Sequence, residues 1–306
     1  MTREVVAVLT ASGLTRRFGD RTVLDGVDLA VRPGRMTGFV GANGAGKTTT
    51  MRILLGVLAP SAGEVSWDGR PVTAADRRSF GYMPEERGLY PKQRVAEQLV
   101  HFGRLHAMSR AAAEAAVADL LERLDLAVHA DDKLESLSLG NQQRAQIAAA
   151  LVHGPTALVL DEPFSGLDPL AVDAMAALLR EEVARDVPVL FSSHQLDLVE
   201  RLCDDVVVLA HGRRVAAGTV EELRSGGPAR LRLEVGAVET GAADLGWLRD
   251  VPGVEVADVD GGAALFSVLE PGVEQRVLAE ALRRGPVRSF TPVVPPLSEV
   301  FREVVR

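Results

Sequence analysis

Cysteine is almost absent from this chain of 306 residues, in which Cys203 is the only one. A single thiol excludes an internal disulfide framework and is typical of a reducing compartment. Lysine is nearly as scarce, so almost all of the 34 basic residues are arginine, and the exceptions are Lys47, Lys92 and Lys133. An ammonium and a planar guanidinium suit different sites, so a lysine kept in such a chain indicates a position where arginine would not serve.

The chain also lacks an apolar run of the roughly 18 residues that are needed to cross a bilayer. Its N-terminal apolar stretch is too short for a secretory leader and carries Glu4. The net charge of −8 excludes the broad basic surplus of a general nucleic-acid binder. We therefore expect a cytoplasmic protein that is soluble by itself, binds no nucleic acid and reaches a membrane only through a partner.

The apolar fraction of 47% and the charged fraction of 25% allow a substantial core, in one large or two modest domains. Alternating apolar residues predict strands at 5–9, 22–31 and 36–40, and a hairpin at 63–72 that turns at Asp68-Gly69. Apolar residues three and four apart predict helices at 47–58 and through much of 92–153, where Ser109 is a suitable N-cap.

After residue 153, buried strands and helices alternate. TALVL at 156–160 and VPVLF at 187–191 are almost wholly apolar, as in a parallel sheet that is covered on both faces. Helical segments follow them at 169–186 and 195–204, and two short strands flank the His211-Gly212 turn. This order predicts an α/β core with a helical insertion.

A looser composition at 224–228, which includes two glycines and Pro228, predicts a linker. Beyond it, strand-like segments at 229–237 and 253–269 and a helical segment at 273–285 predict a small α+β unit that ends in PPLSEVFREVV. The chain is therefore expected to hold a second, smaller domain.

The segment GANGAGKT at 41–48 fits the phosphate-binding pattern G-x-x-x-x-G-K-[ST] and lies between a predicted strand and a predicted helix. Glycines let backbone N–H groups turn inward around a phosphate, and a helix that begins at the loop adds the positive end of its dipole. Lys47 is expected to reach the β- and γ-phosphates, and the Thr48 hydroxyl to bind Mg²⁺. The nucleotide-binding residues predicted here are Gly41, Asn43, Gly44, Gly46, Lys47, Thr48 and Thr49.

The segment LVLDEP at 158–163 places two carboxylates directly after an apolar strand. Asp161, at the strand end, stands where a P-loop protein holds Mg²⁺. Glu162 lies one step further out and is a candidate to orient or deprotonate a water near the γ-phosphate. We predict that this segment and the glycine-rich loop at 41–48, a P-loop, form one nucleotide site.

Three further segments extend the pattern: LSLGNQQR at 137–144, SGLDP at 165–169 and SSH at 192–194. In their order and spacing over residues 3–220, all five segments resemble those of the ATP-binding subunit of ABC transporters. The resemblance implies an α/β P-loop NTPase core at 1–222, with an antiparallel β subdomain and a helical subdomain at about 88–153. Residues 223–306 resemble, more weakly, the small α+β accessory domain of drug- and sodium-efflux exporter subunits, and a plain extension that covers the subunit pair is the alternative.

The same resemblance implies that two ATPase subunits, a homodimer or a pair of related chains, sandwich two ATP molecules head to tail. Ser138, Gly140 and Asn141 are expected to contact the ATP that the P-loop of the other subunit holds. Asp168 is expected to line the subunit interface and couple the two sites.

Within one subunit, the resemblance implies that Phe18 stacks on adenine, although a core phenylalanine beside a turn is the alternative. It also places His194 at the γ-phosphate, linked to Glu162. The expected catalytic residues are therefore Lys47, Glu162 and His194, and the expected cofactors are ATP and Mg²⁺.

Two positions depart from the usual pattern of this family. Where the family commonly has Leu-Ser-Gly-Gly-Gln, this chain has Leu139 for the first Gly and Asn141 for the Gln. In GYMPEERGLYPK at 81–92, Glu85 replaces a Gln that usually touches Mg²⁺ and the attacking water. This stretch is similar to that of an exporter branch. The expected metal ligands are Thr48, Asp161 and Glu85.

The predicted function is ATP hydrolysis that powers export through a separate, polytopic permease, with the chain held on the inner face of the cell membrane. The family docks its permease just after Glu85, where Leu89 and Tyr90 are expected to be exposed, although 87–106 is also typical of a plain surface helix. A soluble ABC-type regulator in DNA repair or translation is the alternative. A nucleotide-binding module without turnover is disfavoured by Glu162 and His194, and an importer by the PEERGLY stretch.

Overall fold

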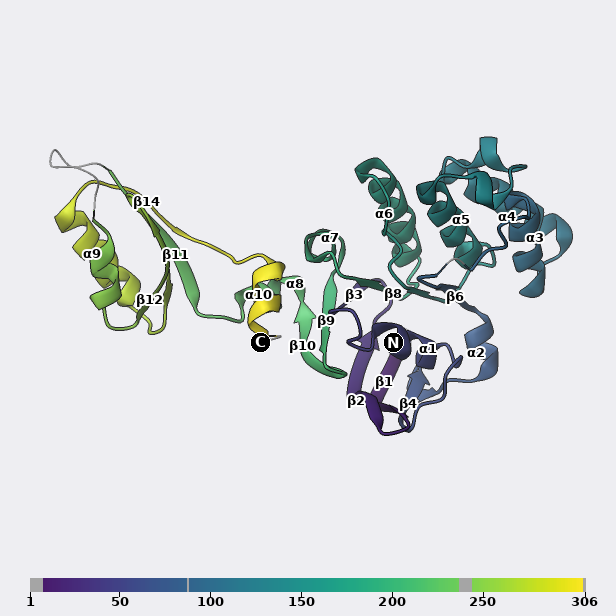
Figure 1. The fold of residues 1–306 in the computed structure, drawn as a ribbon, viewed down its shortest axis with the longest axis horizontal. Coiled ribbons are helices and arrows are strands. Elements are labelled where there is room, and N and C mark those ends of the chain that lie inside the picture. The colour runs from purple at the N-terminus through teal and green to yellow at the C-terminus, as the bar shows by residue number, and fades with distance from the viewer. Residues whose placement is uncertain (1–7, 87, 237–243, 305–306) are drawn as a thin grey trace, which may run out of the picture. The chain divides into compact units, whose positions relative to one another are not determined.

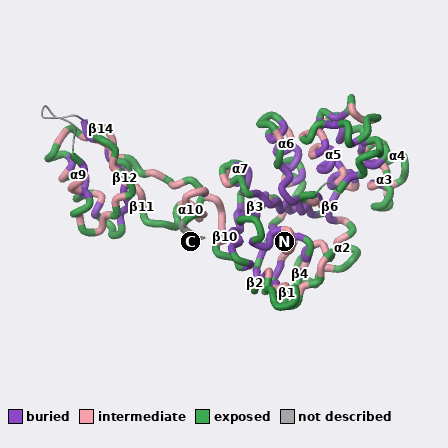
Figure 2. Tube along the Cα trace, in the orientation of Figure 1, coloured by how far each residue is buried: buried purple, intermediate pink, exposed green. Residues whose placement is uncertain are grey.

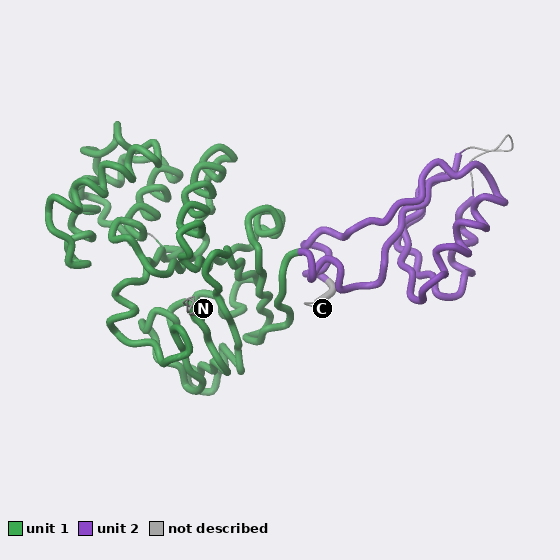
Figure 3. The backbone as a smooth tube through the Cα atoms, turned by 180° about the vertical axis from the view of Figure 1, so that it is seen from behind, with its two compact units in different colours: residues 1–220, 305 green, residues 221–304, 306 purple. Residues whose placement is uncertain are grey.

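The computed structural model describes residues 8–86, 88–236 and 244–304, which form two compact units. The first unit reaches Val220 and the second begins at Glu221 (Figure 3). No helix in these described ranges is long and apolar enough to span a membrane.

A six-stranded sheet forms the centre of the first unit, in the order β10-β9-β3-β8-β7-β6 (Figure 1). Its strands are β3 (Met36–Val40), β6 (Phe80–Met83), β7 (Ala157–Leu160), β8 (Val189–Ser193), β9 (Asp205–Ala210) and β10 (Arg213–Thr219). All neighbours are parallel except β9 and β10, which are antiparallel around the predicted turn. Every residue of β3, β7, β8 and β9 is buried (Figure 2), which confirms the prediction of a parallel sheet covered on both faces.

A second, antiparallel sheet of the first unit has the order β2-β1-β4-β5. Its strands are β1 (Leu9–Phe18), β2 (Arg21–Val31), β4 (Ala62–Trp67) and β5 (Arg70–Pro71). Helix α1 (Lys47–Leu54) shares one apolar core with both sheets, through Met51, Ile53 and Leu54. The predicted hairpin turn is confirmed: Asp68 and Gly69 have φ of 56° and 74°, as a type I′ turn requires.

The other helices of the first unit cover the central sheet or form the helical insertion. They are α2 (Ala74–Arg78), α3 (Val95–Leu105), α4 (Arg110–Arg123), α5 (Leu139–Leu151), α6 (Pro169–Ala184) and α7 (Leu196–Leu202), with the 3₁₀ helices η1 (Ala127–His129) and η2 (Leu134–Ser136). Helices α3, α4 and α5 pack on one another, α6 packs on β8, and α7 packs on β3 (Figure 1). Ser109 caps α4 as predicted, since its hydroxyl accepts the Ala112 N–H at 3.2 Å.

The second unit has a core of its own. Its four-stranded antiparallel sheet has the order β12-β13-β11-β14. Leu233, Phe266 and Val277 are fully buried in one apolar cluster. Its elements are α8 (Val220–Ser225), β11 (Ala229–Val235), η3 (Gly246–Asp250), β12 (Val254–Asp260), β13 (Ala263–Val268), α9 (Val273–Arg284), β14 (Val287–Pro292) and α10 (Leu297–Val304). The strands and the helix predicted beyond residue 229 are thus present.

Several boundaries differ from the sequence-based prediction. Of the strand expected at 5–9, residues 5–7 lie outside the described residues, and β1 runs on through the polar stretch to Phe18. Shifts in its register with β2 break the alternation that would have indicated it. Helix α1 ends before residue 58 because Gly56 adopts a φ of 72°. Helix α8 extends to Ser225, so only residues 226–228 separate it from β11.

The prediction that Leu89 is exposed is wrong. Its side chain is 6% exposed, because it turns inward to a groove that Phe102 and Ala149 also line. Tyr90 is exposed, as expected, with 55% of its surface accessible.

Gly81 lies where β6 passes α5. A Cβ atom on Gly81 would lie 2.3 Å from the carbonyl oxygen of Ala150, a backbone atom that cannot swing aside. We therefore expect Gly81→Ala to lower the free energy of unfolding by about 1–3 kcal/mol, measured by urea unfolding followed by circular dichroism. Gly227→Ala, where the added methyl group meets no atom within 4 Å, is the matched control. An equal loss of stability in both variants would contradict the crowding argument.

Candidate functional site

The glycine-rich loop connects the end of β3 to the start of α1, at one edge of the central sheet. Gly44 and Gly46 have φ of 79° and 109°, in the region that favours glycine. A Cβ atom on Gly46 would also lie 2.5 Å from Cδ2 of Leu24. The loop shape that the phosphate-binding pattern requires therefore depends on glycine at this position.

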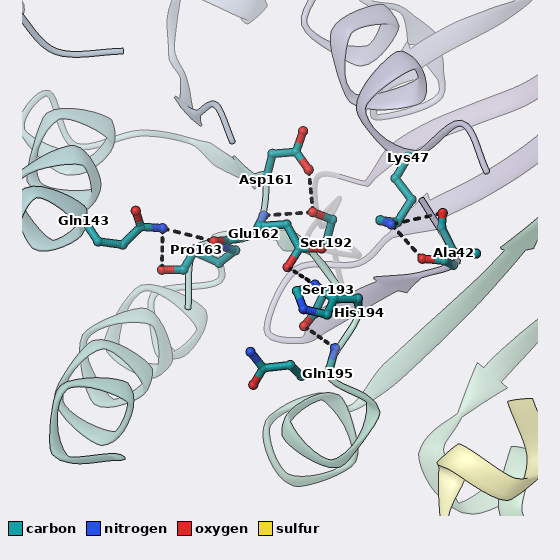
Figure 4. Close-up of polar contacts among 11 residues, drawn as sticks. Ala42, Lys47, Gln143, Asp161, Glu162, Pro163, Ser192, Ser193, His194 and Gln195 are labelled. Atoms are coloured by element: carbon teal, nitrogen blue, oxygen red, sulfur yellow. Dashed lines mark hydrogen bonds and ion pairs between the residues drawn. The ribbon is translucent and has the colours of Figure 1, made fainter. Parts of the chain in front are cut away.

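Lys47 begins α1 and is nearly buried, with 7% of its surface exposed. Its Nζ donates hydrogen bonds to the carbonyl oxygens of Gly41 at 2.6 Å and Ala42 at 3.4 Å (Figure 4). Both partners are neutral carbonyl groups, so these two contacts provide no counter-charge for the ammonium. This arrangement favours an anionic ligand next to Lys47.

Asp161 follows β7 and is almost completely buried, at 1% exposure. The hydroxyl of Ser192, on the neighbouring strand β8, donates to Asp161 Oδ1 at 2.5 Å (Figure 4). The other oxygen, Oδ2, is buried without a hydrogen-bond partner among the described residues. A buried carboxylate oxygen that lacks a donor is suited to a cation.

Glu162 has a φ of 51°, which is uncommon for a residue other than glycine and strains the backbone. Its N–H donates to Ser192 Oγ at 2.9 Å, and its carbonyl oxygen accepts Gln143 Nε2 at 3.0 Å. Its Oε2 lies 3.0 Å from His194 Nδ1 (Figure 4), and because an ionised carboxylate can only accept, Nδ1 is then the donor. These contacts fix both the backbone and the carboxylate of Glu162.

The loop and the carboxylates meet in one cavity of about 440 Å³, as the sequence predicted. The lining residues that the sequence singled out are Asn43, Gly44, Gly46, Lys47, Thr48, Thr49, Glu85, Asp161 and Glu162. Gly41 is not among the lining residues, and a Cβ atom on it would lie 2.5 Å from the Leu209 carbonyl oxygen. Arg21, Val23 and Ala42 also line the cavity. Arg21 and Val23 could not be predicted from the sequence, because their place in the lining depends on how β2 packs beside the loop.

The oxygen-bearing side chains that line this cavity include Thr48, Glu85 and Asp161. Within the described ranges, no three His, Cys, Asp or Glu side chains gather closely enough to form a metal site of their own. Mg²⁺ usually takes one or two carboxylates and keeps waters and substrate phosphates as its other ligands. The unpartnered Asp161 Oδ2 fits an ion that is shared with a bound nucleotide.

Ser138, Gly140, Asn141 and Asp168 do not line this cavity. Ser138 is the exposed N-cap of α5 and accepts the Asn141 N–H at 3.3 Å, while Gly140 lies in the first turn. Asp168 caps α6, with Oδ1 accepting the Ala171 N–H at 2.9 Å. Within one chain, these residues therefore stay apart from the P-loop.

Phe18 ends β1 and is 47% exposed, so it is not a core residue. It does not itself line the cavity, but it is paired across the hairpin with Arg21, which does. The ring thus lies on the strand pair that borders the cavity.

Two family models match the chain. The model described as ABC transporter matches residues 24–165, and the model described as the C-terminal domain of DrrA1-3-like ATP-binding proteins matches residues 218–305. Among solved structures, that of an ATP-binding subunit of an ABC transporter is similar, with 32% identity and a TM-score of 0.67 over 72% of this chain and 92% of the other. A nucleotide-free ATP-binding cassette from an ABC transporter shares the fold, with 24% identity and a TM-score of 0.63 over 70% of this chain and 91% of the other.

Curated relatives extend the similarity along the whole chain. The Nod factor export ATP-binding protein I of Burkholderia lata is 42% identical over 71% of this chain and 73% of its own length. The uncharacterized ABC transporter ATP-binding protein YhaQ of Bacillus subtilis (strain 168) is 37% identical over 97% of this chain and 98% of its own length. With such similarity over almost all of both sequences, the chain belongs to the ATP-binding proteins of ABC transporters.

Proposed function

We propose that this ABC ATPase powers the export of a substrate through a separate membrane permease, as one of two subunits that close around two ATP molecules. The observation that carries the proposal is the single cavity that Lys47, Asp161 and Glu162 line together. A lysine on a glycine-rich loop, a carboxylate suited to a cation and a second carboxylate paired with a histidine are groups suited to ATP hydrolysis.

In the proposed reaction, a water attacks the γ-phosphoryl group in line, and the bond from the γ-phosphorus to the bridging oxygen breaks to release ADP and phosphate. Glu162, held by His194 at 3.0 Å, orients or deprotonates this water. Lys47 exchanges its loop carbonyls for the β- and γ-phosphates and stabilises the developing charge.

Thr48 and Asp161 are the proposed ligands of Mg²⁺, which supplies charge neutralisation at the β- and γ-phosphates when bound. Glu85 lines the same cavity and is the third proposed ligand. Its carboxylate would carry a negative charge that a glutamine would not, and a bound Mg²⁺ would offset that charge.

The proposed partner site is the start of α5. Ser138, Gly140 and Asn141 lie at the N-terminus of a 13-residue helix, where N–H groups and the helix dipole favour an anion. Because they do not line the cavity of their own chain, we propose that they complete the site of the other subunit. Leu139 and Leu170, beside the two helix caps, are 63% and 81% exposed, which supports a subunit interface here.

Export as the direction of transport is supported by two similarities. The Burkholderia lata relative is named for Nod factor export, and the C-terminal unit matches the DrrA1-3-like domain. The PEERGLY stretch, resembling an exporter branch, agrees with both. The exported substance is not specified by these residues, and the proposed place of the chain is the inner face of the cell membrane, against the permease.

A groove of about 400 Å³ is the proposed docking site of the permease. Its mainly apolar lining is Leu55, Val57, Phe80, Tyr82, Pro84, Leu89, Phe102 and Ala149. At one side His106 and His153 stack, with ring centroids 3.7 Å apart. Burial and the neighbouring His106 lower the pKa of His153 to about 4, so its ring is neutral near pH 7 and suits an apolar partner.

Lys47→Ala removes the ammonium that is held beside the loop. We expect ATP affinity to fall by at least roughly tenfold, because charge-assisted bonds to the phosphates are lost, with no binding at micromolar ATP by isothermal titration calorimetry. Lys92→Ala, which removes an exposed lysine, is the control and should bind as the wild type does. Normal binding by Lys47→Ala would refute the assignment of the loop.

Glu162→Gln keeps the shape of the side chain and removes its capacity as a base. We expect the rate of ATP hydrolysis to fall by roughly 10²–10⁴-fold, and the ATP-bound pair of subunits to persist in light scattering. Glu64→Gln, an exposed residue of β4, is the matched control. Wild-type turnover in Glu162→Gln would exclude Glu162 as the base, and a variant that stays monomeric with Mg-ATP would count against pairing.

If a permease docks in this groove, we expect a polytopic membrane protein to co-purify with tagged Glu162→Gln protein from detergent-solubilised membranes. Adding Val57→Asp places a charge in the groove and should reduce this recovery severalfold, because burying an unpaired charge is costly. Val128→Asp, on another exposed valine outside the groove, should not. Recovery from the cytosol with ribosomes or DNA would instead favour a soluble ABC-type regulator.

A further inference from the structure

Arg16 lies over the ring of Phe18. The guanidinium carbon is 4.5 Å from the ring centroid, within the distance of about 6 Å at which a cation is attracted to an aromatic face. One face of the ring is therefore covered by the guanidinium. The residue as a whole is still 47% exposed, so part of it remains accessible to a ligand.

The position of Arg16 is fixed by its surroundings. Its Nη1 donates a hydrogen bond to the carbonyl oxygen of Ala59 at 2.9 Å, on the segment that follows α1. The same segment is also hydrogen-bonded to β1 through Ser61. The Ser61 N–H donates to the Thr15 carbonyl oxygen at 2.7 Å, and the Ser61 hydroxyl accepts the Arg17 N–H at 3.1 Å. The guanidinium is thus clamped between a backbone carbonyl and the ring.

One polar atom of Arg16 is in an energetically unfavourable environment. Its Nε is buried and has no hydrogen-bond partner among the described residues, although a buried donor normally finds one. Residue 16 also lies at a shift in the register between β1 and β2. An arginine kept in such a place is better explained by its contact with the ring than by the packing of the sheet.

The stacked pair adjoins the ATP cavity. Phe18 is directly opposite Arg21 in the antiparallel pairing of β1 and β2, and side chains of such pairs lie on the same face. Arg21 and Val23 line the cavity. The half-exposed Phe18 therefore lies within the strand pair that a nucleotide extending beyond the phosphates would meet.

We propose that Arg16 is a positioning residue for the base of ATP: it covers one face of Phe18 so that the base stacks on the other, in a guanidinium–phenyl–base stack. This inference rests on the proposed function. Without Arg16, the ring at the end of β1 would sample several rotamers, and fixing it would oppose binding. With Arg16, the ring is oriented before the nucleotide arrives.

The test separates the base from the phosphates. Arg16→Ala is expected to weaken ATP binding by about two- to tenfold, while the affinity for inorganic tripolyphosphate, which has no base, stays unchanged. Isothermal titration calorimetry of the full chain with each ligand and Mg²⁺ measures both values. Arg16→Lys, which keeps a cation able to reach the ring, is expected to lose less affinity than Arg16→Ala.

Two further variants serve as controls. Arg17→Ala removes an equal charge one residue along and leaves the Arg16–Phe18 stack in place, so it should bind ATP as the wild type does. In a Phe18→Ala background, Arg16→Ala should produce no additional loss, because the ring through which it acts is gone.

Each outcome bears on a different claim. An unchanged ATP affinity in Arg16→Ala, or equal losses for ATP and tripolyphosphate, would overturn the role of Arg16 and leave the proposed function intact. A wild-type chain that binds neither ligand would overturn the proposed function, and this inference with it. A loss for ATP alone that depends on Phe18 supports the inference.

Discussion

The parallel pairing of β3, β8 and β7 is the constraint on which the proposed ATP site depends. Parallel neighbours end at the same edge of a sheet, so the segments that follow them meet there. The glycine-rich loop follows β3, Asp161 and Glu162 follow β7, and His194 follows β8. A change of one strand's direction would remove one group from the site. The full burial of these strands on both faces is what maintains this arrangement.

Helix α5 connects the residues that are proposed to serve the other subunit with the backbone of Glu162. Its N-terminus carries Ser138, which is proposed to serve the other subunit, and its next turn carries Gln143. The Gln143 amide donates to the carbonyl oxygens of Glu162 and Pro163, both at 3.0 Å. The strained backbone of Glu162 is thus held by the same helix whose first turn is expected to meet the partner's ATP. A shift of α5 would act on both.

The sequence predicted those parts of the molecule that residue chemistry or strict periodicity dictates. A loop built on Gly46 and Lys47, and carboxylates after an apolar strand, are required by phosphate and metal binding whatever surrounds them. The register between paired strands cannot be predicted in this way, because it depends on pairing between segments that are distant in the sequence. For this reason the bulged strand β1, the inward turn of Leu89 and the places of Arg21 and Arg16 could not be predicted. The sequence shows these residues but not their neighbours.

Each of the two units closes an apolar core of its own, and the first unit ends at Val220, where the second begins at Glu221. This boundary lies at the start of α8, so a genetic exchange there would interrupt no strand and open neither core. The C-terminal unit can therefore be replaced or lost during evolution while the ATPase is retained. Separate family models that match 24–165 and 218–305 agree with such independent inheritance.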